Sequence, residues 1–124
     1  MIRKPLFFVG SALEDLAAFP VDVKRVTGFA LHLAQIGEKH VDARPLRGFG
    51  GATVLEVVEN HEGNTFRAVY TVRFFDAVYV LHAFQKKSKK GIATPKQHID
   101  LVKRRLKQAE EHHAEWSKSK GKES

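Results

Sequence analysis

Arg67 is the residue whose type and setting most clearly suggest chemistry. The surrounding residues alternate between the two faces of a predicted strand, so Arg67 lies beside Thr65 and Val69, where a guanidinium needs a partner. Its planar fork can hold a phosphate through two hydrogen bonds. A cross-strand salt bridge with Glu56 explains the residue equally well. Both interpretations stay open from the sequence, and both can hold in alternate states.

Glu56 is the candidate carboxylate partner of Arg67. It is flanked by Val54 and Val58, which places it on a half-buried face of the preceding strand. A carboxylate in that setting can serve as the general base for a sugar hydroxyl. An ion pair with Arg67 or with Arg47 is at least as good an explanation, so the role of Glu56 stays open as well.

Histidine and cysteine usage adds little catalytic potential. His82 lies between Val80 and Phe84, which favours a core histidine with one satisfied ring nitrogen over a proton donor. The adjacent pair His112-His113 lacks a metal-binding spacing, and the chain contains no Cys. The other histidines form no constellation: His32, His40, His61 and His98. We therefore expect no metal site and no cofactor.

The positive charge is concentrated in one segment. The chain has 124 residues and a net charge of +7, but residues 85–107 alone contain nine Lys and Arg against one acid, Asp100. Such a segment suits a phosphate backbone, or an acidic protein that mimics it, better than a mixed solvated helix face. We expect nucleic-acid contacts from Arg47, Arg73, Lys89, Lys90, Lys96, Arg104 and Arg105.

Length and composition limit the class of protein. An apolar fraction of 43% excludes a disordered polycation, and the length allows one domain, which we place at residues 1–116. Residues 117–124 have no apolar side chain and are expected to be a disordered polar tail. The apolar runs are too short to cross a bilayer, so a cytoplasmic location without membrane contact is the expectation.

The elements that must position these residues can be read from the periodicity. A strand over 5–10 is followed by a short helix that Ser11 and Glu14 start as a capping box, and then by a helix after Pro20. Residues 44–51 are expected to be irregular because they contain three glycines and a proline.

The second half changes period. Strands are predicted over 54–59, 65–74 and 78–86, joined by short turns as an antiparallel meander. A basic loop leads to a final helix, with Thr94 as its N-cap and Pro95 in its first turn. The order is β-α-α-β-β-β-α, an α+β domain with a small antiparallel sheet, two N-terminal helices and a C-terminal helix.

Several segments together resemble the RelE/ParE toxin superfamily, within it the HigB-like branch often labelled phage-derived. The resemblance extends over residues 5–106, and its most specific part is the Leu-His-Ala-Phe-Gln-Lys-Lys stretch at 81–87, followed by Thr94-Pro95. The other matching segments are 44–49, 54–57, 63–70 and 104–106.

This resemblance implies the toxin of a type II toxin–antitoxin pair. Such proteins enter the ribosomal A site and cut mRNA without a metal, by activating a ribose 2′-hydroxyl against the neighbouring phosphate. It implies that Arg67 stabilises the phosphate and Glu56 is the base or positions it. Lys86 and Lys87 would supply the cationic end of the last strand, and Arg47 a further cation.

The resemblance leaves the general acid unassigned. Many ribosome-dependent members carry a His or Tyr near the C-terminus, where this chain has a basic loop and a helix; His82 and Lys86 are the candidates here. The implied partners are a helix-turn-helix antitoxin, the ribosome and mRNA. A non-nucleolytic, ParE-like inhibitor that acts by protein binding and a plain RNA-binding module are the alternatives.

Overall fold

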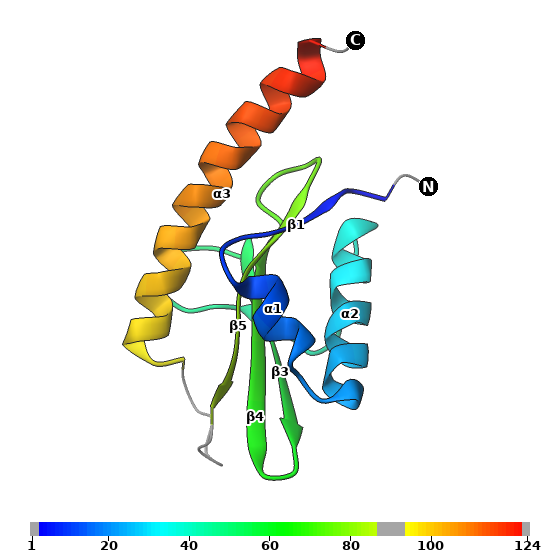
Figure 1. Cartoon of the computed structure of the whole chain (residues 1–124), viewed down its shortest axis with the longest axis vertical. Coiled ribbons are helices and arrows are strands. Elements are labelled where there is room, and N and C mark those ends of the chain that lie inside the picture. Colours follow the sequence, from blue (N-terminus) through cyan, green and yellow to red (C-terminus); the bar gives the residue numbers. More distant parts are fainter. Residues whose placement is uncertain (1–2, 87–93, 123–124) are drawn as a thin grey trace.

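A computed structural model describes residues 3–86 and 94–122 of the chain. Two N-terminal helices and one long C-terminal helix pack on a five-stranded sheet (Figure 1). In chain order the elements are β1 (Leu6–Phe8), α1 (Ala12–Ala17), α2 (Val21–Gln35), β2 (Ala43–Pro45), β3 (Val54–His61), β4 (Asn64–Thr71), β5 (Val78–Lys86) and α3 (Lys96–Lys122). The predicted α+β class and the predicted helices are confirmed.

The sheet is mixed, whereas the sequence predicted an antiparallel one. The strand order is β1-β5-β4-β3-β2, and β1 runs parallel to β5 while the other pairs are antiparallel. Two helices follow β1, so no hairpin fixes its direction. The strand β2 was also not predicted, because Pro45 and the nearby glycines obscured three residues that pair at the edge of the sheet, where Pro is tolerated.

Each face of the sheet is covered by helix. Tyr70 and Leu55 pack with Ala30 and Leu31 of α2 on one face, whereas Val69 packs with residues of α3 on the other. The predicted alternation along β4 is therefore confirmed, with both of its faces buried. Figure 1 shows α3 on one side of the sheet and α1 and α2 on the other side.

The hairpin between β3 and β4 sets the register of the site. His61 pairs with Asn64 across a two-residue turn, and the turn residues Glu62 and Gly63 have φ of 49° and 82°. Two positive φ values are typical of the primed hairpin turns whose twist suits antiparallel strands. The turn therefore fixes which residues of the two strands share a face.

The helix α3 extends further than the sequence predicted. It continues to Lys122 through the segment 117–122 that composition assigned to a disordered tail. Trp116 packs on Phe7, and the Lys120 ammonium lies over the Trp116 ring and 3.1 Å from Asp76. These contacts hold the polar last turns against the body. No helix in residues 3–86 or 94–122 is long and apolar enough to cross a membrane.

Arg105 ties α3 to two other elements. Its Nη1 donates to the Leu81 carbonyl of β5 at 3.0 Å, and its Nη2 donates to Ser11 Oγ at 3.1 Å. Ser11 in turn donates to Asp15 Oδ2 at 2.8 Å, and it makes no hydrogen bond to the backbone of the helix start. The predicted capping box is therefore wrong, because the Ser11 hydroxyl donates its proton to Asp15 and accepts a hydrogen bond from Arg105.

Replacing Arg105 by Met should destabilise the fold by about 2–3 kcal/mol, because two charge-assisted hydrogen bonds are lost and a backbone carbonyl loses its donor. The neighbouring Arg104 is exposed, so Arg104→Met is the matched control and should change the free energy of unfolding by no more than about 0.5 kcal/mol. Urea denaturation measures both values. Equal midpoints for the two variants would contradict the tethering role.

Candidate functional site

Arg67 and Glu56 form a buried ion pair inside the sheet. Arg67 Nη1 donates to Glu56 Oε1 at 2.9 Å, and only 2% of the Arg67 side chain is exposed. In the β3–β4 register Arg67 pairs with Val58 and Glu56 pairs with Val69, so the two charged side chains are diagonal neighbours on the α3 face. The salt bridge between them, one of the two interpretations left open, is confirmed.

Thr94 completes a triangle with this pair. Its Oγ1 accepts a hydrogen bond from Arg67 Nη1 at 3.1 Å and donates one to Glu56 Oε1 at 3.2 Å. The sequence predicted that this hydroxyl caps α3, but the helix begins at Lys96 and the Pro95 carbonyl accepts from the Ile99 amide. The Thr94 hydroxyl is directed at the ion pair and joins the start of α3 to β3 and β4.

A cavity of about 330 Å³ opens beside this triangle. Glu56 and Thr94 form part of its wall, together with the exposed Arg44 of β2 and the exposed Arg47 of the segment between β2 and β3. The other described residues that line it are Pro45, Leu46 and Ile99. The cavity therefore combines one carboxylate, one hydroxyl and two guanidinium groups, which is a donor and acceptor set suited to a sugar phosphate.

A bulge in β5 places His82 on the same face as Arg67. Val69 pairs with His82 and Tyr70 pairs with Val80, so Leu81 is an additional residue in the strand. Leu81 and His82 consequently both face α3, where Leu81 packs with Val102. The sequence could not reveal this extra residue, because it breaks the alternation within a uniformly apolar run.

His82 and His98 form a hydrogen-bonded pair that the sequence did not predict. His82 Nε2 lies 2.8 Å from His98 Nδ1, and the His98 ring stacks on Phe84 with centroids 3.9 Å apart. His82 Nδ1 faces Arg105 Nη1 at 3.4 Å. A guanidinium only donates, so His82 carries its proton on Nε2 and donates to His98. The view that His98 has no constellation is therefore wrong.

His82 is neutral at physiological pH in this environment. Burial, the neighbouring His98 ring and the Arg105 guanidinium lower the pKa of His82 from 6.5 to about 4, against the opposite effect of Asp15. Burial and the Lys86 ammonium also lower the pKa of His98. His82 thus has the surroundings of a buried, satisfied histidine, as its sequence context favoured.

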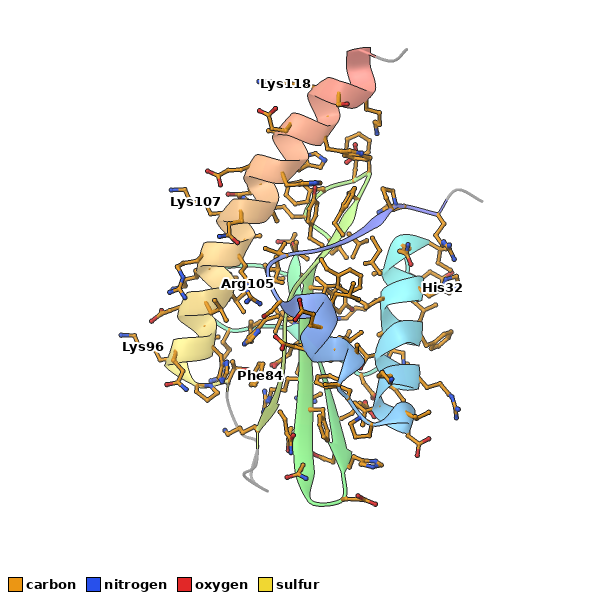
Figure 2. All side chains as sticks on the ribbon, in the orientation of Figure 1. His32, Phe84, Lys96, Arg105, Lys107 and Lys118 are labelled. Carbon is orange, nitrogen blue, oxygen red and sulfur yellow. The ribbon has the colours of Figure 1, made fainter. Side chains whose placement is uncertain are left out.

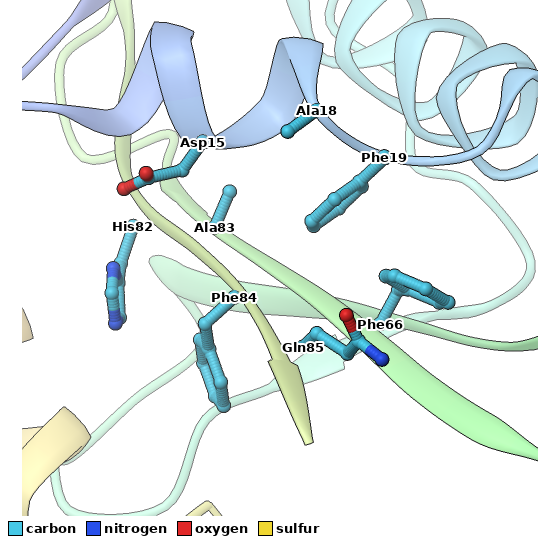
Figure 3. Close-up of a pocket in the computed structure, with 8 residues that line it drawn as sticks. All are labelled: Asp15, Ala18, Phe19, Phe66, His82, Ala83, Phe84 and Gln85. Atoms are coloured by element: carbon cyan, nitrogen blue, oxygen red, sulfur yellow. The ribbon is translucent and has the colours of Figure 1, made fainter. Parts of the chain in front are cut away.

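A second hollow lies beside β5 (Figure 3). Its volume is about 280 Å³. The strand β1 pairs with residues 78–80 of β5, and residues 82–85, further along β5, line this hollow. In Figure 3 His82 and Phe84 project to one side of β5, and Phe19 and Phe66 lie on the other. The remaining lining residues are Asp15, Ala18, Ala83 and Gln85.

The predicted RNA-binding cations and the other cations of the basic segment occupy different settings. Lys96, Lys103, Arg104 and Lys107 are exposed on α3, whereas Arg105 points toward the body and is engaged as described above (Figure 2). Arg73 forms an ion pair with Glu110. Lys86 is half-buried at the end of β5, and Lys87, Lys89 and Lys90 lie outside the described residues. Among the described residues, no group of three His, Asp or Glu could hold a metal ion.

Comparison with known proteins gives one family and a distant structural match. The family described as phage-derived protein Gp49-like (DUF891) matches residues 14–107. No curated protein matches the sequence. The toxin–antitoxin complex RelBE2 from Mycobacterium tuberculosis has a chain that is similar at a TM-score of 0.43 and 17% identity, covering 71% of this chain and 97% of that chain.

The His82 environment predicts a pH dependence of stability. Because the folded pKa lies below the unfolded value near 6.5, the unfolded chain binds more protons, and stability falls as the pH drops from about 6.5 towards 4. The free energy of unfolding should fall by on the order of 2 kcal/mol between pH 7.5 and pH 5. Urea denaturation at pH 7.5 and 5 measures it, and His82→Gln should reduce the difference. NMR titration showing a His82 pKa near 6.5 would contradict this account.

The Arg67–Glu56 pair predicts non-additive destabilisation. Arg67→Met leaves a buried carboxylate without its cation and should cost about 3–5 kcal/mol, as should Glu56→Leu for the opposite reason. The double variant should cost clearly less than the sum of the two. Additive free energies of unfolding in this double-mutant cycle would show that the pair is not coupled.

Proposed function

The chain belongs to the phage-derived Gp49-like family, and on that premise we propose that it is the toxin of a type II toxin–antitoxin pair. This agrees with the HigB-like, phage-derived branch that the sequence resembles. The proposed activity is ribosome-dependent cleavage of mRNA without a metal, and the proposed location is the cytoplasm, where ribosomes translate.

One observation carries the proposal: the Glu56 carboxylate lies in the wall of a cavity that two exposed arginines, Arg44 and Arg47, also line. Glu56 is held by Arg67 at 2.9 Å, so it is oriented before any substrate enters. RNA brings its own nucleophile, and no nucleophilic side chain is required of the protein. The cavity supplies the two other requirements of the reaction, a general base, Glu56, and positive charge from Arg44 and Arg47.

The proposed reaction assigns a task to each group. Glu56 takes the proton of the ribose 2′-hydroxyl while the 2′-oxygen bonds to the adjacent phosphorus. Arg47 and Arg67 stabilise the negative charge of the pentacoordinate phosphorane. The bond from phosphorus to the 5′-oxygen then breaks, and Lys86 is the proposed donor of the proton to that oxygen. The products are a 2′,3′-cyclic phosphate and a 5′-hydroxyl.

The exposed cations of α3 have a different proposed task. Lys96, Lys103, Arg104 and Lys107 are exposed along one helix and are suited to the phosphate backbone of ribosomal RNA. His82 is a poorer acid than Lys86 because it is neutral and only 6% exposed. A small helix-turn-helix antitoxin is the proposed partner that silences the protein.

A non-nucleolytic inhibitor that acts by protein binding is the second candidate. The observation that favours it is the burial of Arg67, whose guanidinium is already bound to Glu56 and Thr94. In that case the ion pair stabilises the sheet and the toxic activity depends on the surface. Toxicity that survives Glu56→Gln would support this candidate.

The nuclease proposal predicts cleavage of mRNA at the A site when the purified protein is added to translating ribosomes, detected by primer extension. Glu56→Gln should lower the rate by at least about 100-fold, the usual contribution of a general base. Arg47→Ala, at an exposed position, should weaken cleavage without unfolding the protein.

The matched control is Arg25→Ala on α2, an arginine whose side chain is 76% exposed and is not among the residues that line the cavity. It should cleave as the wild-type protein does. If the wild-type protein leaves mRNA on translating ribosomes intact, the proposal is wrong.

A further inference from the structure

The hydroxyl of Thr94 makes the contacts that a substrate hydroxyl would need. It donates to Glu56 Oε1 at 3.2 Å and its oxygen accepts from Arg67 Nη1 at 3.1 Å. A ribose 2′-hydroxyl in front of a general base must donate to the carboxylate in the same way and at a similar distance. We propose that Thr94 Oγ1 occupies the subsite of the ribose 2′-hydroxyl and that RNA displaces it. This inference rests on the proposed nuclease function.

The match extends to hydrogen-bonding capacity. A hydroxyl has one proton to donate and two lone pairs that accept, and Thr94 uses the proton on Glu56 and a lone pair on Arg67. Replacement by a sugar hydroxyl preserves both bonds, so the buried charges never lose a partner. A phosphate oxygen could not substitute, because it would place an acceptor against the carboxylate.

Access to this subsite comes from the cavity. Thr94 and Glu56 both line it, and Thr94 is half-buried, so its hydroxyl lies at the boundary between the ion pair and the open space. Rotation about the Cα–Cβ bond of Thr94 moves the hydroxyl away from Glu56 without moving the backbone. Arg44 and Arg47, which line the same cavity, can then hold the phosphates on either side of the ribose.

The cavity is of the right kind for such a group. About 330 Å³ is at the lower end of the range for ligand sites, which suits one nucleotide rather than a folded RNA. Two charged groups meet at the hydroxyl position, since Glu56 Oε1 and Arg67 Nη1 both bond to Thr94 Oγ1 and to each other. The subsite therefore selects ribose over deoxyribose.

Thr94→Val tests the proposal, because valine has the shape of threonine without the hydroxyl. Binding of a single-stranded RNA hexanucleotide and of the DNA hexanucleotide of the same sequence is measured without ribosomes, for example by fluorescence anisotropy. The variant should bind the RNA about three- to tenfold more tightly than the wild-type protein, the range expected for one net hydrogen bond, and the DNA with unchanged affinity.

Thr94→Ser keeps the hydroxyl and should retain the wild-type ratio of RNA to DNA affinity. A purely structural Thr94 would alter binding of RNA and DNA equally, and that outcome, or weaker RNA binding by Thr94→Val, would overturn the proposal. Urea denaturation establishes that each variant is folded. Because the ratio is measured without cleavage, a wild-type protein that binds RNA but cuts no mRNA would refute the nuclease function separately from the subsite.

Discussion

Neutralisation of the Arg67 guanidinium is the constraint around which the site is arranged. An arginine keeps its charge inside a protein, so burial to 2% exposure requires a carboxylate with good geometry. The β3–β4 hairpin supplies it, since its turn places Glu56 and Arg67 diagonally on one face. A slip of one residue would move Glu56 to the opposite face and leave the charge unpaired.

The same ion pair anchors the residues that lead into α3. Thr94 bonds both members of the pair, and Thr94 is two residues before the first residue of α3, Lys96. One turn further on, His98 stacks on Phe84, which is the cross-strand partner of Arg67. Arg105 then secures the helix to β5 and Ser11. The cavity exists because these contacts hold α3 beside the segment between β2 and β3.

Local patterns in the sequence were sufficient for most elements. The strand alternation around Arg67 and the hairpin turn each depend on neighbouring residues, so the sequence contains the whole signal. The ion pair of Glu56 with Arg67 was one of the interpretations that the sequence left open. The role of either residue in catalysis stays a prediction, because a stable ion pair and a catalytic pair have the same sequence signature.

The features that sequence did not reveal all depend on distant partners. The parallel pairing of β1 needs β5, some seventy residues later, and the Leu81 bulge is visible only in the register with β4. The spacing of Ser11 and Glu14 fits a helix cap, but the Ser11 hydroxyl bonds to Arg105, which is 94 residues away in the sequence. His98 and Thr94 acquire their partners in the same way, through the docking of α3.

The cations of the basic segment are not equivalent, which changes the meaning of the net charge. Arg105 belongs to the basic segment but is hydrogen-bonded to the body of the protein. Arg67, which lies outside that segment, is buried. Neither arginine adds to the exposed positive surface. The exposed charge on α3 comes from Lys96, Lys103, Arg104 and Lys107. Arg44 and Arg47 add exposed positive charge near Glu56. Attraction of a polyanion and chemistry on one of its phosphates therefore depend on separate residues. Salt should screen the exposed set strongly and the buried ion pair much less, because screening acts through solvent.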